Sequence, residues 1–284
     1  MIPQNTRFLD TGAQSAAWNM AVDEVLLENC RAHIAAGHSP EEAPLAFRVY
    51  TWSPPALTLG RGQAAERDVD MARLEEEGVD LCRRLTGGRA VLHDREITYS
   101  LAGPEALLGD SIEESYRRIS AGLAAGLARL GAPVEFAPPS GRAYASQASC
   151  FATTSVWELS IGGRKVAGSA QCREGGAILQ HGSILLISPE ERLARLLKPR
   201  GGKPRGGGPR GGEDRAIGLS EAMGREVGYA EAAAALRWGM AEALSAAFPE
   251  VPLSAGERVR AGEIAERRYR NPAWTLDRGA GPAS

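Results

Sequence analysis

The sequence predicts an α+β domain with a largely antiparallel sheet, and three observations support this prediction. Strand-like and helix-like runs are mixed along the 284 residues without a regular alternation, which is typical of α+β folds. Glycine pairs join several strand runs as tight turns, and tight turns connect antiparallel strands. The length suits one large domain, and we see no second core and no internal repeat.

The first half of the chain begins with a predicted amphipathic helix over 15–29, with Ser15 as its N-cap. Asp23 and Glu24 lie beside the apolar stripe of this helix, and we expect both at a solvated edge. Strands follow where apolar residues alternate or run together, over 45–52, 56–59, 79–85 and 97–101.

The clearest helix is predicted over 111–130, because Ser111 and Glu114 form a capping box and Gly131 occupies the C′ position. A three-stranded meander with glycine-pair turns is expected next, with strands over 155–161, 164–172 and 177–187. Further helices are expected from Ser188-Pro189 onward, over 230–248 and over 257–269.

Composition argues against several classes of function. A net charge of −2 gives no reason to expect nucleic acid or a membrane surface as the principal partner. No run approaches the roughly 18 consecutive apolar residues that a membrane helix needs, and the N-terminal residues show no secretory signal. We therefore expect a cytoplasmic protein.

One of the four cysteines stands out. None belongs to a C-x-x-C pair or has the spacing of zinc ligands, so we expect free thiols and no metal. Cys150 follows a polar run after a loop with proline and glycine, which favours an accessible, reactive thiol. Cys82 and Cys172 lie in strand runs, where burial is the simpler account, and Cys30 follows the predicted end of a helix.

Lys165 begins an apolar strand directly after a tight turn, fifteen residues beyond Cys150. A thiol and an amine are the minimum needed to move an acyl group from a thioester to another nucleophile, because a nearby ammonium favours the thiolate. An exposed lysine at the end of a hairpin is the alternative. The turn places Lys165 opposite about Ser160, so Cys150 can reach it only if the loop before Ser155 folds back over the sheet.

The segment Arg83–Asp94 is a second candidate. Its Gly87-Gly88 pair would let the backbone approach a ligand closely, and its arginines favour an anionic or carbonyl ligand. The segment lacks the spacing of a nucleotide P-loop or a dinucleotide fingerprint, so a plain turn is equally compatible. His93 is either a base of the site or a structural histidine, and we expect His181 to be a satisfied polar residue in a strand.

Together these segments resemble the lipoate-biotin ligase and acyltransferase superfamily, and within it the LipM-type octanoyltransferases. The matching segments are Trp18–Glu24, Trp52–Arg61, Arg83–His93, Cys150, Gly163–Gln171 and Gln180–Ser183. The likeness runs from about residue 5 to residue 190. Leu85 departs from the pattern, since many relatives carry proline or another small residue there.

The resemblance implies a mixed sheet flanked by helices, which agrees with the strands predicted above. It implies a catalytic domain over 33–248 and a C-terminal helical tail over 249–284. The enzyme would take an octanoyl group from octanoyl-acyl carrier protein and deliver it to a lysine of a lipoyl domain, typically the H protein of the glycine cleavage system. Thioester-to-amide transfer is downhill, so no cofactor is expected. We expect a monomer with neither nucleic acid nor a membrane among its partners.

Site residues also follow from this resemblance. Cys150 would carry the acyl-thioester intermediate, and Lys165 would lower the pKa of the thiol and shuttle protons. The acyl tunnel would be lined by the substrate-binding residues Arg84, Gly87, Gly88, His93, Gly168 and Gln171.

Two rivals share the expected fold. An ATP-dependent lipoate-protein ligase would activate the free acid as an adenylate, and Cys150 would be incidental. Such a ligase usually carries an accessory C-terminal domain, for which the residues after about 230 are too few. An amidotransferase would move octanoate from the H protein to other lipoyl domains, and the Gly88–His93 run favours the LipM type over it.

Residues 199–212 repeat Pro-Arg-Gly-Gly and cannot bury apolar surface, so we expect a mobile loop. A basic contact for an acidic carrier protein is one functional alternative. An RNA-binding segment is another, but this one lacks interleaved aromatic residues.

Overall fold

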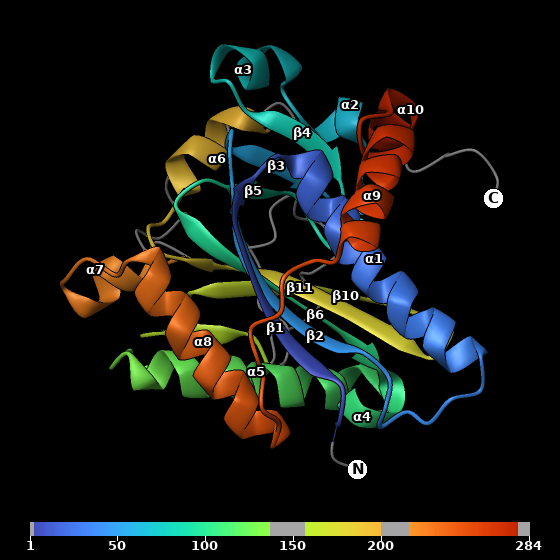
Figure 1. Cartoon of the computed structure of the whole chain (residues 1–284). Coiled ribbons are helices and arrows are strands. Elements are labelled where there is room, and N and C mark those ends of the chain that lie inside the picture. The colour runs from blue at the N-terminus through green and yellow to red at the C-terminus, as the bar shows by residue number, and fades with distance from the viewer. Residues whose placement is uncertain (1–2, 137–156, 200–215, 278–284) are drawn as a thin grey trace.

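The computed structural model describes residues 3–136, 157–199 and 216–277 (Figure 1). A five-stranded sheet lies at its centre, in the order β1-β2-β6-β11-β10. β1 pairs with β2 in parallel, and the other neighbours are antiparallel, so the predicted mixed, largely antiparallel sheet is confirmed. The strands are β1 (Thr6–Gln14), β2 (Leu45–Trp52), β6 (Glu96–Pro104), β10 (Ala167–Glu174) and β11 (Ala177–Leu185).

Two smaller sheets of three strands accompany it, in the orders β4-β3-β5 and β7-β8-β9. The first contains β3 (Ala56–Leu59), β4 (Asp80–Arg83) and β5 (Val91–His93), and the second β7 (Glu135–Phe136), β8 (Leu159–Ile161) and β9 (Arg164–Lys165). The predicted meander is therefore split at Val166, where the chain leaves the β8-β9 pair and enters the large sheet as β10. Both glycine-pair turns have positive φ, between 56° and 79°, as tight hairpins require.

Helices cover both faces of the large sheet (Figure 1). On one face α1 (Ala16–Ala35) lies against the strands and is itself covered by α9 (Ala255–Ile264) and the π-helical turn η3 (Ala265–Tyr269). On the other face α5 (Ile112–Arg129) and α8 (Tyr229–Leu244) pack together. The shorter helices are α2 (Ala65–Asp68), α3 (Met71–Glu76), α4 (Glu105–Leu108), α6 (Glu190–Leu196), α7 (Leu219–Met223) and α10 (Pro272–Leu276).

Two predicted helix caps are formed, with one difference. The Ser15 hydroxyl accepts from the backbone N–H of Trp18, and the Ser111 hydroxyl accepts from that of Glu114. The carboxylate of Glu114 binds Arg118 at 2.9 Å, one turn further along α5, and so competes with the reciprocal half of the predicted capping box. No helix in the described ranges has the length and apolar character needed to cross a membrane.

β1 was not predicted from the sequence, because it is held in place by backbone pairing with segments that are distant along the chain. It pairs with β2 on one side, and on the other Phe8 donates to the carbonyl of Pro249 and accepts from the N–H of Val251. The boundaries 33–248 and 249–284 stay predictions. The predicted mobile loop 199–212 lies outside the described residues, except for Pro199.

α5 and α8 approach so closely that glycine is required where they cross. A Cβ added to Gly239 of α8 would lie 2.3 Å from the Gly122 carbonyl oxygen and 2.3 Å from the Gly126 nitrogen, both on α5. Such distances are far inside van der Waals contact. The small residues therefore set the spacing of the two helices that cover this face of the sheet.

We expect Gly239→Ala to lower the free energy of unfolding by about 1–3 kcal/mol, because the extra methyl group overpacks the helix crossing. Gly262→Ala in α9 is the matched control, since a Cβ there meets nothing within 4 Å. That change should raise the free energy of unfolding by about 0.5–1 kcal/mol, because alanine favours the helix. Urea denaturation measures both, and equal effects would contradict the close crossing.

Candidate active site

A narrow cavity is bounded by the large sheet, the β4-β3-β5 sheet and α1. Most of its wall is apolar, and Arg84 and His181 in that wall are hydrogen-bonded within the protein. Its lining residues are Met20, Tyr50, Trp52, Thr58, Arg84, Val91, His93, Thr98, Gly168, Ser169, Ala170, His181, Gly182 and Ser183. Three predicted substrate-binding residues, Arg84, His93 and Gly168, are among them.

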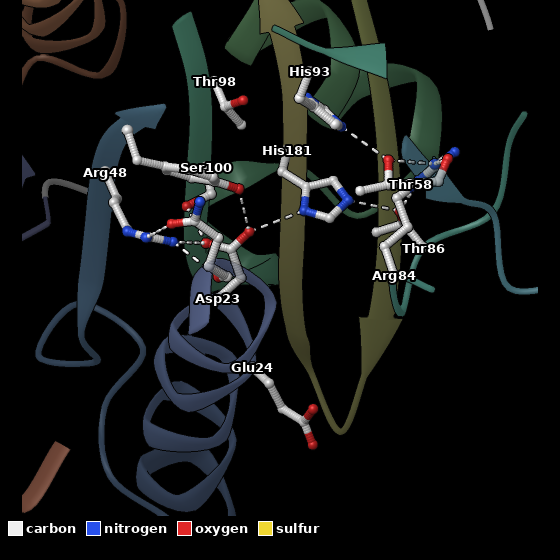
Figure 2. Close-up of polar contacts among 12 residues, drawn as sticks. Asp23, Glu24, Arg48, Thr58, Arg84, Thr86, His93, Thr98, Ser100 and His181 are labelled. Carbon is white, nitrogen blue, oxygen red and sulfur yellow. Dashed lines mark hydrogen bonds and ion pairs between the residues drawn. The ribbon is translucent and has the colours of Figure 1, made fainter. Parts of the chain in front are cut away.

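Asp23 of α1 lies over one row of the large sheet. Neighbouring strands place Arg48, Ser100 and His181 in register across β2, β6 and β11. Asp23 Oδ1 accepts from Arg48 Nη1 at 2.8 Å and from Ser100 Oγ at 2.7 Å. Its Oδ2 lies 3.0 Å from His181 Nδ1 and accepts from the Tyr50 hydroxyl at 2.8 Å. Figure 2 shows this carboxylate at the centre of the cluster.

The expectation of a solvated edge for Asp23 and Glu24 was wrong: their relative exposures are 1% and 5%. α1 is enclosed by the sheet on one side and by α9 and η3 on the other. Burial alone would raise the pKa of Asp23, but the His181 hydrogen bond and the Arg48 charge outweigh it and lower that pKa. Glu24 contacts Tyr269 and Arg268 of η3, and burial raises its pKa.

Arg84 holds the glycine loop rather than presenting a free guanidinium to the cavity. Its Nη2 donates to the carbonyl oxygens of Gly87 and Arg89 at 2.8 and 2.7 Å. A Cβ on Gly88, whose φ is 89°, would lie 2.9 Å from the same Nη2, so glycine is needed there. Gly87 and Gly88 themselves do not line the cavity. The predicted substrate-binding loop is thus anchored to the cavity wall through Arg84.

A hydrogen-bond chain runs from Arg84 to Asp23 (Figure 2). Arg84 Nε donates to the Thr86 hydroxyl at 3.2 Å, and Thr86 Oγ1 lies 2.7 Å from His181 Nε2. A guanidinium can only donate, so Thr86 accepts from Arg84. The pKa of Asp23 is lowered and its carboxylate can only accept, so His181 Nδ1 carries a proton and donates to Asp23. His181 is therefore a satisfied polar residue in a strand, as predicted.

A second chain runs from Arg84 to His93. Arg84 Nη1 donates to the Thr58 hydroxyl at 3.1 Å, and Thr58 Oγ1 lies 2.9 Å from His93 Nε2. His93 Nδ1 lies 3.4 Å from Glu96 Oε1 and has no hydrogen-bond partner among the described residues. The ring stacks on Trp52 with centroids 4.1 Å apart, and burial lowers the pKa of His93. His93 is thus neutral at neutral pH.

Arg83 and Gln171 lie away from the cavity. Arg83 is fully buried, and its guanidinium donates to carbonyl oxygens of Gly60 and Thr275. These bonds connect α10 to the β4-β3-β5 sheet. Gln171 donates to Gln180 Oε1 at 2.9 Å and to Ser115 of α5 at 3.0 Å. Gln171 therefore belongs to the α5 side of the sheet, and its predicted place in the acyl tunnel is not supported by these contacts.

Lys165 occupies the predicted register but is not exposed. β9 places it opposite Ser160, as the tight turn indicated. Its side chain is only 1% exposed, and its Nζ donates to Glu158 Oε1 at 2.7 Å. Lys165 does not belong to the residues that line the cavity. Cys150 lies outside the described residues, so the pairing of its thiol with Lys165 stays a prediction.

The three described cysteines are poorly suited to nucleophilic catalysis. Cys30 and Cys82 are buried, and Cys172 is half-buried. Burial raises the pKa of each thiol to about 12, so little thiolate exists at neutral pH. Cys30 lies inside α1, not beyond its end, because the helix runs six residues past the predicted boundary at 29.

Sequence reasoning did not find the buried carboxylates that contact the two histidines of the cavity and Lys165. These are Asp23, Glu96 and Glu158. A signal existed for Asp23. The run Met20–Leu27 is apolar around most of the helix, which is typical of a buried helix, and an acid in such a run needs a buried partner. No comparable local pattern marks Glu96 or Glu158, because their partners come from other strands.

We expect Asp23→Asn to lower the free energy of unfolding at pH 7 by about 3–5 kcal/mol, because it leaves Arg48 buried without its counter-charge. Since the folded-state pKa of Asp23 is lowered, its contribution is present above about pH 4 and is lost as the pH falls through the folded value. The difference between variant and wild type should therefore shrink in acid. Glu24→Gln, one position along, should cost less at pH 7, because burial already disfavours the charged form.

Guanidinium denaturation at pH 7 and at about pH 3.5 measures these differences. A penalty for Asp23→Asn that is unchanged between the two conditions would contradict the lowered pKa.

Comparison with known proteins identifies the family. The model of the lipoyl protein ligase A/B catalytic domain matches residues 15–240. Octanoyltransferase LipM of Kyrpidia tusciae is 42% identical over 268 residues, which cover 92% of this chain and 95% of that protein. Octanoyltransferase LipM of Symbiobacterium thermophilum is 39% identical, over 96% of this chain and 98% of that protein.

Among solved structures, a bi-partite lipoate protein ligase from Thermoplasma acidophilum superposes with a TM-score of 0.80 at 21% identity, over 99% of this chain and 100% of that one. At this identity the likeness concerns the fold. The chain belongs to the lipoyl protein ligase A/B catalytic domain family, and within it to the LipM octanoyltransferases.

Proposed function

We propose that this octanoyltransferase takes its acyl group from octanoyl-acyl carrier protein and passes it, through a thioester on Cys150, to a lysine of a lipoyl domain. The observation that carries the proposal is the 42% identity to an octanoyltransferase over nearly the whole of both chains. The fold alone does not separate transferases from ligases, because the lipoate protein ligase from Thermoplasma acidophilum has it too. We propose the glycine cleavage H protein as the acceptor, and a cytoplasmic monomer as the working form.

The cavity is suited to an alkyl chain. Its polar side chains are engaged within the protein, as with Arg84 and His181, and Met20, Trp52 and Val91 supply apolar surface. Each methylene group moved from water into such surroundings contributes about 0.8 kcal/mol. A fatty acyl chain therefore gains more from this cavity than a charged or strongly polar ligand, whose groups would find few free partners.

The proposed chemistry balances without ATP. The Cys150 thiolate attacks the thioester carbonyl, the bond from the acyl carbon to the carrier's sulfur breaks, and that sulfur takes a proton from the Lys165 ammonium. The acceptor amine then attacks the acyl-enzyme, and the bond from the acyl carbon to the Cys150 sulfur breaks. Neutral Lys165 takes the proton from the attacking nitrogen. Both side chains end as they began, as thiolate and ammonium.

The donor requirement tests the activity against its rivals. We expect labelled octanoate to pass from octanoyl-acyl carrier protein to purified H protein without ATP, because the thioester already holds the energy of the amide bond. A strict need for ATP and free octanoate would establish a ligase instead. Faster acylation of the enzyme by octanoyl-H protein than by octanoyl-carrier protein would establish an amidotransferase.

The thioester step has its own test. After incubation with octanoyl-acyl carrier protein, wild-type protein should gain the mass of one octanoyl group, and hydroxylamine should remove it because it cleaves thioesters. Cys150→Ala should show no such adduct. Cys172→Ala is the matched control and should keep the adduct, since burial raises the pKa of the Cys172 thiol to about 12. An adduct that survives in Cys150→Ala would rule out this cysteine as the carrier.

A further inference from the structure

Lys165 and Glu158 form an ion pair that is sealed from solvent. Nζ and Oε1 are 2.7 Å apart, and the two side chains are 1% and 4% exposed. Lys165 ends β9 opposite Ser160, and Glu158 lies two residues before Ser160, so the ion pair runs diagonally across one short hairpin. The two charges are thus held against each other out of contact with water.

The backbone fixes Lys165 from both sides. The Val166 N–H donates to the carbonyl of Leu159 at 2.9 Å, which closes the β8-β9 pair. On the opposite side the carbonyl of Lys165 accepts from the N–H of Ile217 at 3.0 Å. A lysine side chain is flexible, with four rotatable bonds. Here the backbone at Lys165 is held by hydrogen bonds on both sides, and the amine is held by the ion pair with Glu158. The position of the amine is therefore set before any substrate arrives.

The other titratable and charged groups around this hairpin have separate engagements. Glu135 on β7 is exposed, and its Oε1 accepts from the Gly163 N–H at 3.0 Å. Arg164 pairs with Glu221 at 2.8 Å. Tyr99 on β6 is the phenol electrostatically coupled to Glu158, and burial raises the pKa of Tyr99 to about 12, so it is neutral. Within the described ranges, Glu158 is the carboxylate that accepts from Lys165 Nζ.

We propose that Glu158 is a positioning residue, which holds the Lys165 amine in place for the proton transfers of the acyl transfer. This inference rests on the proposed function, in which Lys165 moves protons. In the first step Lys165 gives its proton to the departing carrier thiolate, and in the second it regains one from the acceptor amine. Glu158 makes and breaks no bond, and it stabilises the ammonium at the beginning and end of each cycle.

The pH dependence of acyl-enzyme formation tests this role. Octanoylation rates, measured by rapid quench and intact mass with octanoyl-acyl carrier protein as the donor, should fall by about 10²-fold in Lys165→Ala. In Glu158→Gln the carboxylate charge beside Lys165 Nζ is removed, so the basic limb of the rate profile should move to lower pH by about one unit. On the basic side of the profile this shift lowers the rate by roughly tenfold. Glu158→Asp keeps the negative charge and should return the limb toward the wild-type pH.

Glu135→Gln is the matched control, because it removes an exposed carboxylate from the same hairpin region. Its rate and basic limb should equal those of wild type. A basic limb in Glu158→Gln that stays at the wild-type pH, while Lys165→Ala is slow, would overturn the inference alone. Wild-type protein that forms no Cys150 adduct would overturn the proposed function, and the inference would fall with it.

Thermal denaturation shows whether each Glu158 variant folds, so that an effect of the lost charge can be told apart from a loss of structure. If Glu158→Gln does not fold, Glu158→Asp decides, because its shorter side chain stretches the ion pair while keeping its charge. A reduced acylation rate with a basic limb near the wild-type pH is then expected. A rate and limb both identical to wild type would show that the distance to the ammonium is unimportant and would overturn the positioning role.

Discussion

The buried ion pair between Asp23 and Arg48 is the interaction on which the arrangement of the site depends. Two charges can lie between α1 and the large sheet only if every remaining donor and acceptor finds a partner. Arg48 therefore also donates to Thr11 and to both the backbone and the side chain of Asn19. These contacts fix the position of α1 on the large sheet. Asp23 of α1 then lies within hydrogen-bond distance of His181 of β11.

A chain of hydrogen bonds connects this ion pair to the wall of the cavity. His181 links Asp23 to Thr86, and Thr86 links it to Arg84, whose guanidinium holds the glycine loop. The wall of the cavity is mostly apolar, although it contains two histidines and an arginine, and Arg84 and His181 are hydrogen-bonded within the protein.

A second buried pair, Glu158 with Lys165, lies in a different sheet from the cavity wall. The division arises at Val166, where the chain passes from the β8-β9 pair into β10 of the large sheet. Lys165 and Gly168 are three residues apart in the sequence, yet Lys165 belongs to the buried ion pair and Gly168 to the cavity wall. The switch between sheets separates the ion pair from the cavity.

Local physical chemistry is enough to predict the features that depend on neighbours in the chain. Ser15 and Ser111 cap their helices, the glycine pairs form tight turns, and Lys165 lies opposite Ser160, because each depends on a few adjacent residues. The family motifs of the sequence likewise predicted the acyltransferase assignment, which the comparisons confirm.

Burial and partners across the sheet required the tertiary structure. The sequence places Asp23 beside an apolar stripe, but only the packing of α1 against the large sheet removes it from water. Arg84 was expected to meet a ligand, and Gln171 to line the tunnel. Their hydrogen-bond partners come from strands and loops far away in the sequence, and the face that a side chain presents depends on which sheet its strand joins. A residue's type limits the chemistry it can perform, and the electrostatic environment that selects among those possibilities exists only after folding.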